Sequence, residues 1–442
     1  MSADLAAYPA DTSEDAVRAF LGSAHPIDLA AWLALMPVDE AWALLSGLED
    51  ARRASVFENL PLGFQVDLAQ HMAPDDLARI VGAMNADDRV DLFNQLPAAA
   101  QDRLARDLEP SVREDMRRLS TYAEGSAGAI MTSDFAILDA DMTAEGAIDA
   151  LRLQAPGKET IYRSYVVDRD QRLTGSVRLH ALILAEGEAR IDTLMEPAPV
   201  SVTLETDQED VAKLIARYDL LAIPVLDGAG RLVGIVTHDD AADVMQAEAT
   251  EDFQKISTVL PFTQNMRQAG IGMLYSRRIV WLALLIFGNL FSGAGIAYFE
   301  DVILAYVSLV FFLPLLIDSS GNAGSQSATL MVRALATGDV ALSDWRDLLL
   351  REAAVAAALG ATMAAVVFPL GAWRGGMDIA MTVSLTMFVA VLIGSLVGMS
   401  LPFVLSRLRL DPATASGPLV TTISDGLGVI LYFTIASLVL NI

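Results

Sequence analysis

The chain has 442 residues, of which 56 are acidic and 30 are basic, so its formal net charge is -26; it has no cysteine and four histidines. This length predicts several domains, and the acidic balance excludes nucleic acid as a partner, because phosphate binding needs Lys and Arg. Disulfides and thiolate metal sites are excluded as well, so oxygen ligands are the metal chemistry that remains.

Acidic and apolar residues are segregated along the chain. Nearly all the acid lies before residue 260 and nearly all the long apolar runs lie after it. This pattern predicts a soluble acidic part followed by a membrane part. The first residues are polar and acidic, so we expect no signal peptide, and residues 1–24 are predicted to be flexible.

An internal repeat of twelve residues runs through residues 25–124. Proline often follows the repeated apolar residue, and acidic pairs recur beside it; both favour the first turn of a helix. The pattern predicts short helices stacked into a right-handed or superhelical solenoid. The repeated residues are Met36, Leu48, Leu60, Met72, Met84, Leu96 and Leu108.

Residues 129–247 contain two copies of a β-α-β-β-α pattern, at about 129–190 and 191–247. Each copy has a predicted helix, at about 143–154 and 207–219, followed by two apolar strands. The two copies resemble a tandem CBS domain pair, a regulatory α/β module. In the second copy Thr237 and Asp239 match the ribose-binding motif of nucleotide-binding CBS modules, whereas the first copy lacks the acid. ATP binding and a plain structural turn both remain open.

A single helix is predicted over about 239–270, with its connecting part at 248–273. Two groups of acids share a face of this helix: Asp240 with Asp243, and Glu248 with Glu251 and Asp252. Like charges at this spacing repel each other. A divalent cation would turn this repulsion into a binding site, because Mg²⁺ takes carboxylate and water oxygens.

Five apolar segments follow, each able to cross a bilayer at about 1.5 Å per residue, the second by extending into a polar stretch. Arginines concentrate before the first segment and in the loops after the second and fourth, so we expect the soluble part in the cytoplasm and the C-terminus outside. The five segments are 279–299, 302–317, 353–373, 379–406 and 419–440.

Two polar stretches interrupt this apolar region. Residues 318–329 contain Gly, Ser, Asn, Gln and an Asp, and we expect a break of the membrane helix there that lines a wet path. In the last segment Asp425 lies between Pro418 and Gly426. A carboxylate inside a membrane costs a few kcal/mol or more, so it is expected to face a pore, a partner or the interior of the bundle.

The ordered motifs of these stretches are similar to the signature of MgtE-type magnesium channels. They are Pro314, Gly321 to Thr329, Arg333 to Thr337, and Asp411 to Pro418 followed by Thr421, Thr422, Ser424, Asp425 and Gly428. The resemblance implies a helical N domain, a CBS pair, a connecting "plug" helix that closes the pore when Mg²⁺ is bound, and a five-helix transmembrane domain (residues 274–442). It also implies a homodimer in the inner membrane, with Mg²⁺ as both substrate and regulator.

By this resemblance Asp425 is the selectivity residue of the pore. Mg²⁺ releases its water reluctantly, so a pore that holds the hydrated ion through one carboxylate and several neutral oxygens is expected. Asp318, Asn322 and Gln326 either line the path or satisfy broken backbone. The predicted pore residues are Asp425, Thr421, Thr422, Ser424, Asn322 and Gln326, with Gly417, Gly426 and Gly428 allowing helices to approach closely.

The predicted regulatory metal residues lie in the soluble part. Asp87 and Asp91 are four residues apart on one helical face of the repeat region, and the others follow from the resemblance. They are Glu209, Ala216, Asp219, Asp240, Asp243, Glu248, Glu251 and Asp252. At high Mg²⁺ the ion would bridge these acidic surfaces and close the channel.

Two alternatives remain beside a magnesium channel. A transporter of the same fold could carry Mn²⁺ or Co²⁺, because oxygen ligands alone do not rank these ions. A membrane-anchored nucleotide sensor without transport would contain the polar stretch only by accident. An enzyme is not expected, since no histidine follows His238 and no nucleophile–base set is visible in the apolar region.

Overall fold

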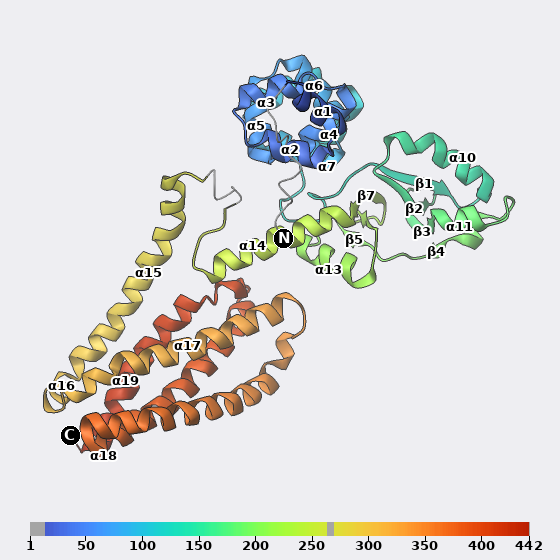
Figure 1. Cartoon of the computed structure of the whole chain (residues 1–442). Helices are drawn as coiled ribbons and strands as arrows, with labels where there is room; N and C mark the ends of the chain where they lie inside the picture. Colours follow the sequence, from blue (N-terminus) through green and yellow to red (C-terminus); the bar gives the residue numbers. More distant parts are fainter. Residues whose placement is uncertain (1–13, 263–268, 442) are drawn as a thin grey trace. The chain divides into compact units, whose positions relative to one another are not determined.

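The computed structural model describes residues 14–262 and 269–441 and shows a mostly helical chain (Figure 1). Contacts within the chain define two compact units, residues 1–246 and 247–442. The first unit holds the repeat region and the two β-α-β-β-α copies. The second holds the apolar helices.

Short helices fill the first half of the first unit, and Figure 1 shows them arranged around a ring. Each helix packs against the next but one along the chain, from α2 on α4 to α7 on α9. This is the contact pattern of a superhelix. This confirms the predicted solenoid. The helices are α1 Glu14–Ser23, α2 Pro26–Leu33, α3 Val38–Leu45, α4 Asp50–Glu58, α5 Leu62–His71, α6 Pro74–Ala83, α7 Ala86–Gln95, α8 Ala98–Asp107 and α9 Pro110–Leu119.

The twelve-residue repeat marks the places where these helices end. Met72 and Met84 are the C-terminal cap residues of α5 and α6, and both are buried, as Leu60 is after α4. One repeat therefore supplies one helix and one core residue at its end. The predicted flexible N-terminus is wrong for residues 14–23, which form α1; residues 1–13 lie outside the described residues.

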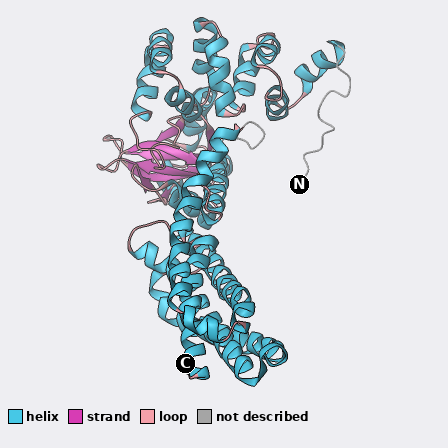
Figure 2. Cartoon of the chain, turned by 90° about the vertical axis from the view of Figure 1, so that its left-hand side faces the viewer, coloured by secondary structure: helices cyan, strands magenta, loops and turns pink. Residues whose placement is uncertain are grey.

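The two α/β copies follow, and the described strands all belong to them (Figure 2). The first sheet has the order β1-β2-β3-β4, and the second has the order β5-β6-β7; β1–β2 and β5–β6 are parallel pairs and the other pairs are antiparallel. The elements are β1 Phe135–Asp139, α10 Ala144–Gln154, β2 Thr160–Val167, β3 Leu173–Arg178, α11 Leu179–Leu184, α12 Ile191–Leu194, β4 Glu196–Pro197, β5 Val202–Thr203, α13 Gln208–Tyr218, β6 Ala222–Leu226 and β7 Leu232–Thr237; a 3₁₀ turn, η2, spans Ala155–Gly157.

The opening segment of each copy pairs with the sheet of the other copy. Thr132, ahead of β1, bridges to Ile235 of β7, and β4, ahead of β5, pairs with β3. Gly175 and Gly234 make this exchange possible. A Cβ at Gly234 would lie 2.4 Å from the sulfur of Met131, and one at Gly175 would lie 2.6 Å from that of Met195. These two glycines therefore have a packing role.

Helix α14 spans His238–Ile256 and runs from the first unit into the second. The prediction of one helix over about 239–270, with a connecting part at 248–273, is wrong beyond Ile256. Thr258 adopts a left-handed backbone conformation with φ of 55°, which ends the helix. Residues 263–268 of the predicted segment lie outside the described residues.

The second unit packs long apolar helices around a core that includes Phe312, Val383, Tyr432 and Phe433. Its helices are α15 Ile271–Tyr298, α16 Glu300–Ala305, α17 Ser308–Ala336, α18 Trp345–Arg407 and α19 Gly417–Leu440; two 3₁₀ turns, η3 Leu342–Asp344 and η4 Pro412–Thr414, precede α18 and α19. Helix α18 doubles back at Gly376, whose φ of 82° is not helical. The contacts of Gly360 with Phe388 and of Gly371 with Ala380 show that its halves run antiparallel.

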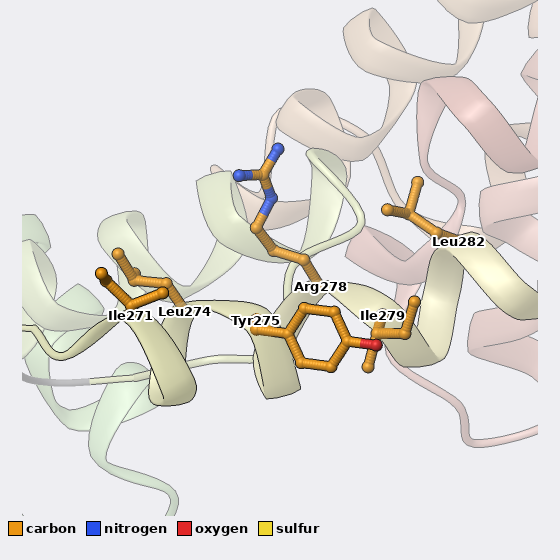
Figure 3. A pocket seen from close by; sticks show the side chains of 6 residues that line it. All are labelled: Ile271, Leu274, Tyr275, Arg278, Ile279 and Leu282. Atoms are coloured by element: carbon orange, nitrogen blue, oxygen red, sulfur yellow. The ribbon is translucent and has the colours of Figure 1, made fainter.

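Three described elements are long and apolar enough to cross a membrane: α15, Leu342–Arg407 and α19. Helix α15 has no buried residue among its 28, so much of its apolar surface is uncovered, although one side packs against α19. Figure 3 shows one groove on this helix, where Tyr275 and Arg278 lie among Ile271, Leu274, Ile279 and Leu282. A tyrosine and an arginine beside exposed apolar residues are typical of a membrane–water interface.

Helix α17 continues without a break through the polar stretch at 318–329, although Pro314 lies inside it. The predicted break of this membrane helix is therefore wrong, and Asn322 and Gln326 are not needed to satisfy broken backbone. The small residues of the stretch serve helix packing instead. A Cβ on Gly324 would lie 2.6 Å from the carbonyl oxygen of Gly394 on α18.

Gly417, Gly426 and Gly428 of α19, which were expected to let neighbouring helices approach closely, do not lie at close helix contacts. The nearest neighbours of a Cβ at Gly417, Gly426 and Gly428 lie 3.5 to 3.9 Å away, which is ordinary contact. The tight approaches instead involve Gly321 and Gly324 of α17 with α19 and α18. The sequence marked glycine-rich helices correctly but not which glycines lie at the contacts.

Candidate ion-binding sites

A polar seam joins α17 and α19 in the second unit. The Ser325 hydroxyl donates to the Gly417 carbonyl oxygen at 3.1 Å and lies 3.2 Å from the Thr421 hydroxyl. The methyl group of Thr421 also contacts Gly321, which has no side chain to keep the helices apart. The seam therefore exists because small residues of α17 let the hydroxyls of α19 approach.

Asp425 lies one turn beyond Thr421 on α19, near this seam. Its Oδ1 atom is buried and has no hydrogen-bond partner within the described residues. The Asp318 carboxylate of α17 is close enough to act on it electrostatically. No Lys or Arg of the described chain forms an ion pair with Asp425. Two neighbouring carboxylates without a basic partner are a site of negative potential suited to a cation.

One face of α17 carries polar side chains that nothing in the described chain covers. Asp318, Asn322 and Gln326 are exposed and recur every four residues. This spacing puts them on one side of the helix. The sequence left the roles of Asp318, Asn322 and Gln326 equally open, and their common spacing of four residues is the signal that groups them.

Thr422 and Ser424 lie away from the seam. The Thr422 hydroxyl donates to the Pro418 carbonyl oxygen, and its methyl group lies against Gly288 of α15, at the edge of an apolar cavity of about 860 Å³ between α15 and α19. Ser424 is 1 % exposed and its hydroxyl has no partner within the described residues. Of the six predicted pore residues, these two are not near the exposed polar face of α17.

An acidic cluster forms in the first unit. Asp87, Asp88 and Asp91 of α7, Glu159 ahead of β2, and Asp239 and Asp240 at the start of α14 act on one another electrostatically. Two hydrogen bonds fix its edges: the Asn85 amide donates to Glu159 at 3.2 Å, and the Thr237 hydroxyl donates to Asp240. Three segments far apart in the sequence thus bring their carboxylates together.

Burial raises the pKa values of these carboxylates, and the neighbouring charges add to the effect. The pKa of Asp88 rises to about 8, and those of Glu159 and Asp240 rise to about 7. Burial also raises the pKa of Asp87 to about 6, although bonds from backbone N–H groups oppose the rise. Burial raises the pKa of Asp91 too, but this residue is exposed, so solvent screens part of the effect.

The cluster includes three predicted regulatory residues, Asp87, Asp91 and Asp240, and two that the sequence analysis missed. Asp88 belongs to one of the acidic pairs that favour the first turn of a repeat helix, and Glu159 gave no signal because it lies about 70 residues from α7. Asp243 is exposed and lies outside the cluster. No three acidic or histidine side chains in the described residues converge as a ready-made metal site. An ion here would therefore keep part of its water shell.

The remaining predicted regulatory residues are distributed over α13 and α14. Glu209 pairs with Lys213 at 2.9 Å, and Ala216 and Asp219 are exposed at the end of α13, where Asp219 caps the helix with φ of 51°. Glu251 pairs with Lys255. Glu248 and Asp252 lie half-buried in the second unit.

A cleft of about 380 Å³ opens between the two α/β copies. It is lined by Tyr162, Arg163, Arg178, Leu179, His180 and Ile183 of the first copy and by Asp219 and Leu221 of the second. The predicted nucleotide residues do not line it. Thr237 is 5 % exposed and bonded to Asp240, and Asp239 faces the acidic cluster. The arginines of the cleft gave no motif that the sequence analysis could use.

Comparison with known proteins assigns all three regions. A family model described as a divalent cation transporter matches residues 313–435, one described as the MgtE intracellular N domain matches 24–125, and the CBS domain matches 127–188 and 191–247. A solved structure of the cytosolic domain of the Mg²⁺ channel MgtE in complex with ATP is 37 % identical, with a TM-score of 0.50, and covers 52 % of this chain and 95 % of that one.

Full-length relatives agree with these matches. The magnesium transporter MgtE of Thermus thermophilus is 38 % identical, covering 96 % of this chain and 95 % of the relative. That of Bacillus subtilis is 31 % identical, covering 95 % and 93 %. The transmembrane-type helices, the CBS pair and the N-terminal solenoid thus occur in one order in one protein family, and the chain belongs to the MgtE family of magnesium transporters.

Proposed function

We propose that the chain is a homodimeric, Mg²⁺-selective channel that takes up magnesium across the inner membrane and closes when cytosolic Mg²⁺ is high. Both full-length relatives are magnesium transporters, which supports Mg²⁺ as the ion. Arginines near the start of α15, from the end of α17 to the start of α18, and at and after the end of α18 support a cytoplasmic soluble part and an outer C-terminus. Helices α15, α17, the two halves of α18 and α19 would be the five passes.

Asp425 is the observation that carries this proposal. A carboxylate with one buried, unpaired oxygen beside Asp318 is costly in a low-dielectric medium unless a cation accompanies it. A hydrated Mg²⁺ ion would relieve the repulsion of the two carboxylates without giving up its inner water shell. The exposed face of α17, with Asp318, Asn322 and Gln326, would meet its copy in a second protomer and enclose the path.

The acidic cluster of the first unit would sense cytosolic Mg²⁺ and control closure of the channel. Without Mg²⁺ the carboxylates of α7, Glu159 and α14 repel one another, which favours a loosened arrangement of the N domain and the CBS pair. With Mg²⁺ the ion bridges them, and the closed arrangement is stabilised by its higher affinity for the ion. Helix α14 links this cluster to the second unit, so it would transmit the change to the pore.

Ion-selective uptake into liposomes tests the conduction proposal. Asp425→Asn keeps the shape of the side chain and removes its charge, so we expect Mg²⁺ uptake to fall at least tenfold. Asp339→Asn is the matched control, because Asp339 lies in the loop after α17 and accepts a hydrogen bond from Thr337. Uptake by the Asp425 variant equal to that of the control would refute the proposal, and a preference for Mn²⁺ or Co²⁺ in the parent would favour the alternative ion.

ATP is a second proposed ligand of the CBS pair. A structural relative is described in complex with ATP, and the cleft between the two copies offers Arg163 and Arg178 to phosphates and Tyr162 to a base. Both arginines also pair with Glu196, so they are held in place. Calorimetric titration of the full-length protein with ATP tests this, since absence of heat at millimolar ATP would exclude the site.

A further inference from the structure

The end of α14 is fastened to the loop that leads into α19 by one lysine. Lys255 pairs with Glu251 one turn earlier on α14 and with Asp411 in the loop after α18. These three groups lie in the second unit. The pKa of Lys255 is raised; its bonds to Asp411 and Glu251 raise it against the effect of burial. Its ammonium is therefore charged at every physiological pH.

Asp411 connects this ion pair to the start of α19. Its Oδ2 atom binds Lys255, while its Oδ1 atom accepts a 2.8 Å hydrogen bond from the Ala413 N–H and so caps η4. Five residues after Asp411, the buried Ser416 caps α19 itself. Asp425 is eight residues into that helix, about 12 Å along its axis. Movement of Asp411 would be passed to the pore helix through two successive caps.

Apolar packing and hydrogen bonds also position the end of α14. Ile256 packs with Ala413, Ala415 and Val332, the last from α17. Gln254 exchanges two hydrogen bonds with the backbone of Phe262, which folds the chain back after α14. The end of α14 therefore contacts α17 and the loop that leads into α19.

We propose that Lys255 is a positioning residue for transport, whose ammonium ties the gating helix α14 to the cap of the pore helix α19. The proposal rests on the gating function proposed above. The Lys255 side chain is 24 % exposed and that of Asp411 is 36 %, so the pair adds little to stability. Its role is to make α14 and α19 move together, and its removal should uncouple them without unfolding the protein.

Currents in inside-out membrane patches, with Mg²⁺ varied at the cytoplasmic face, test this tie. We expect Lys255→Met and Asp411→Asn each to raise the half-closing Mg²⁺ concentration at least fivefold, with single-channel conductance unchanged. Lys255→Arg and the exchanged pair K255D/D411K should close within twofold of the parent, because each retains an ion pair. Arg152→Met, which removes an exposed Arg–Asp pair of α10, is the control and should match the parent.

A role in folding alone would lower the number of channels and the melting temperature without moving the half-closing concentration. If the parent closes normally and the Lys255→Met and Asp411→Asn variants close at the same Mg²⁺ concentration, the tie is refuted while the gating proposal stands. A parent that conducts Mg²⁺ but never closes would refute the gating proposal, and the tie with it.

Discussion

Individual carboxylates would bind the ions in the proposed pore and in the proposed sensor. Their surroundings divide these carboxylates into two kinds. Asp425 lies beside Asp318 among apolar helices, with no basic group in the described chain to balance it. Asp88 lies partly buried in a larger acidic cluster of the first unit. The first kind suits passage of an ion, because one carboxylate pair holds it weakly. The second suits sensing, because many carboxylates must move together.

The acidic cluster makes stability depend on pH in a defined direction. The pKa values of Asp88, Glu159 and Asp240 are raised in the folded state, to about 8, 7 and 7, above the ordinary value near 4. Between pH values of about 4 and 8 the folded state therefore binds more protons than the unfolded state. The free energy of unfolding falls as pH rises through this range. In Mg²⁺-free buffer, we expect a lower melting temperature at pH 8.5 than at pH 6, and added Mg²⁺ should restore it.

Asp88→Asn removes the most strongly shifted group and should raise stability at pH 8.5 by about 1–2 kcal/mol in the absence of Mg²⁺, while reducing the stabilisation by Mg²⁺. Asp149→Asn is the control, because Asp149 is exposed and pairs only with Arg152 in the described chain. Calorimetric unfolding of the full-length protein measures both effects. Equal stability of the Asp88 variant and the parent at pH 8.5 would mean that the cluster carries no net repulsion.

At the scale of elements, close helix contacts in the second unit depend on glycine. Helices α17 and α18 approach so closely that a methyl group on Gly398 would lie 2.0 Å from the Gly324 carbonyl oxygen. A backbone atom cannot rotate away as a side chain does. The polar stretch of α17 is therefore held against α18 by the absence of side chains, and the exposed polar face lies on the other side of the same helix.

Gly398→Ala should consequently separate α17 from α18 and lower stability by about 1–3 kcal/mol. Gly293→Ala provides a matched control on α15, where a methyl group meets no atom within 4 Å and alanine is the better helix former. Thermal unfolding in detergent compares the two variants. A Gly398 variant as stable as the Gly293 variant would show that α17 and α18 can shift apart at no cost.

The whole molecule is incomplete as a single copy if it forms a pore. The polar residues of α17 are exposed within a group of apolar helices, where lipid would be a poor neighbour for them. A second copy related by a two-fold axis would place the same residues opposite one another. This arrangement can be tested directly, because the chain has no native cysteine to complicate cross-linking.

Asn322→Cys should give a disulfide-linked dimer on mild oxidation in membranes, since Asn322 would face its copy near the axis. Phe287→Cys serves as control, because Phe287 is 69 % exposed on α15, away from the polar face of α17. Non-reducing electrophoresis measures the linked fraction, which we expect to be several-fold higher for the Asn322 variant. Equal linking at both positions would argue against a dimer axis at α17.

The sequence by itself determined the order of the solenoid, the CBS pair and the apolar helices, because the twelve-residue repeat, the β-α-β-β-α copies and the long apolar runs are local patterns. It also singled out Asp425 as a candidate, since a carboxylate in an apolar segment is unusual wherever the helix lies. These features depend on residues that are close along the chain, so the spacing of apolar and polar residues in the sequence is enough to predict them.

Only the tertiary structure decided which groups meet. It brought Glu159 close to Asp87, placed Thr422 against α15 and not beside Asn322, ended α14 at Ile256, and brought Lys255 to Asp411 across 156 residues of sequence. The reason is physical: burial, desolvation and ion pairing arise between side chains that are close in space, and separation along the sequence says little about that distance.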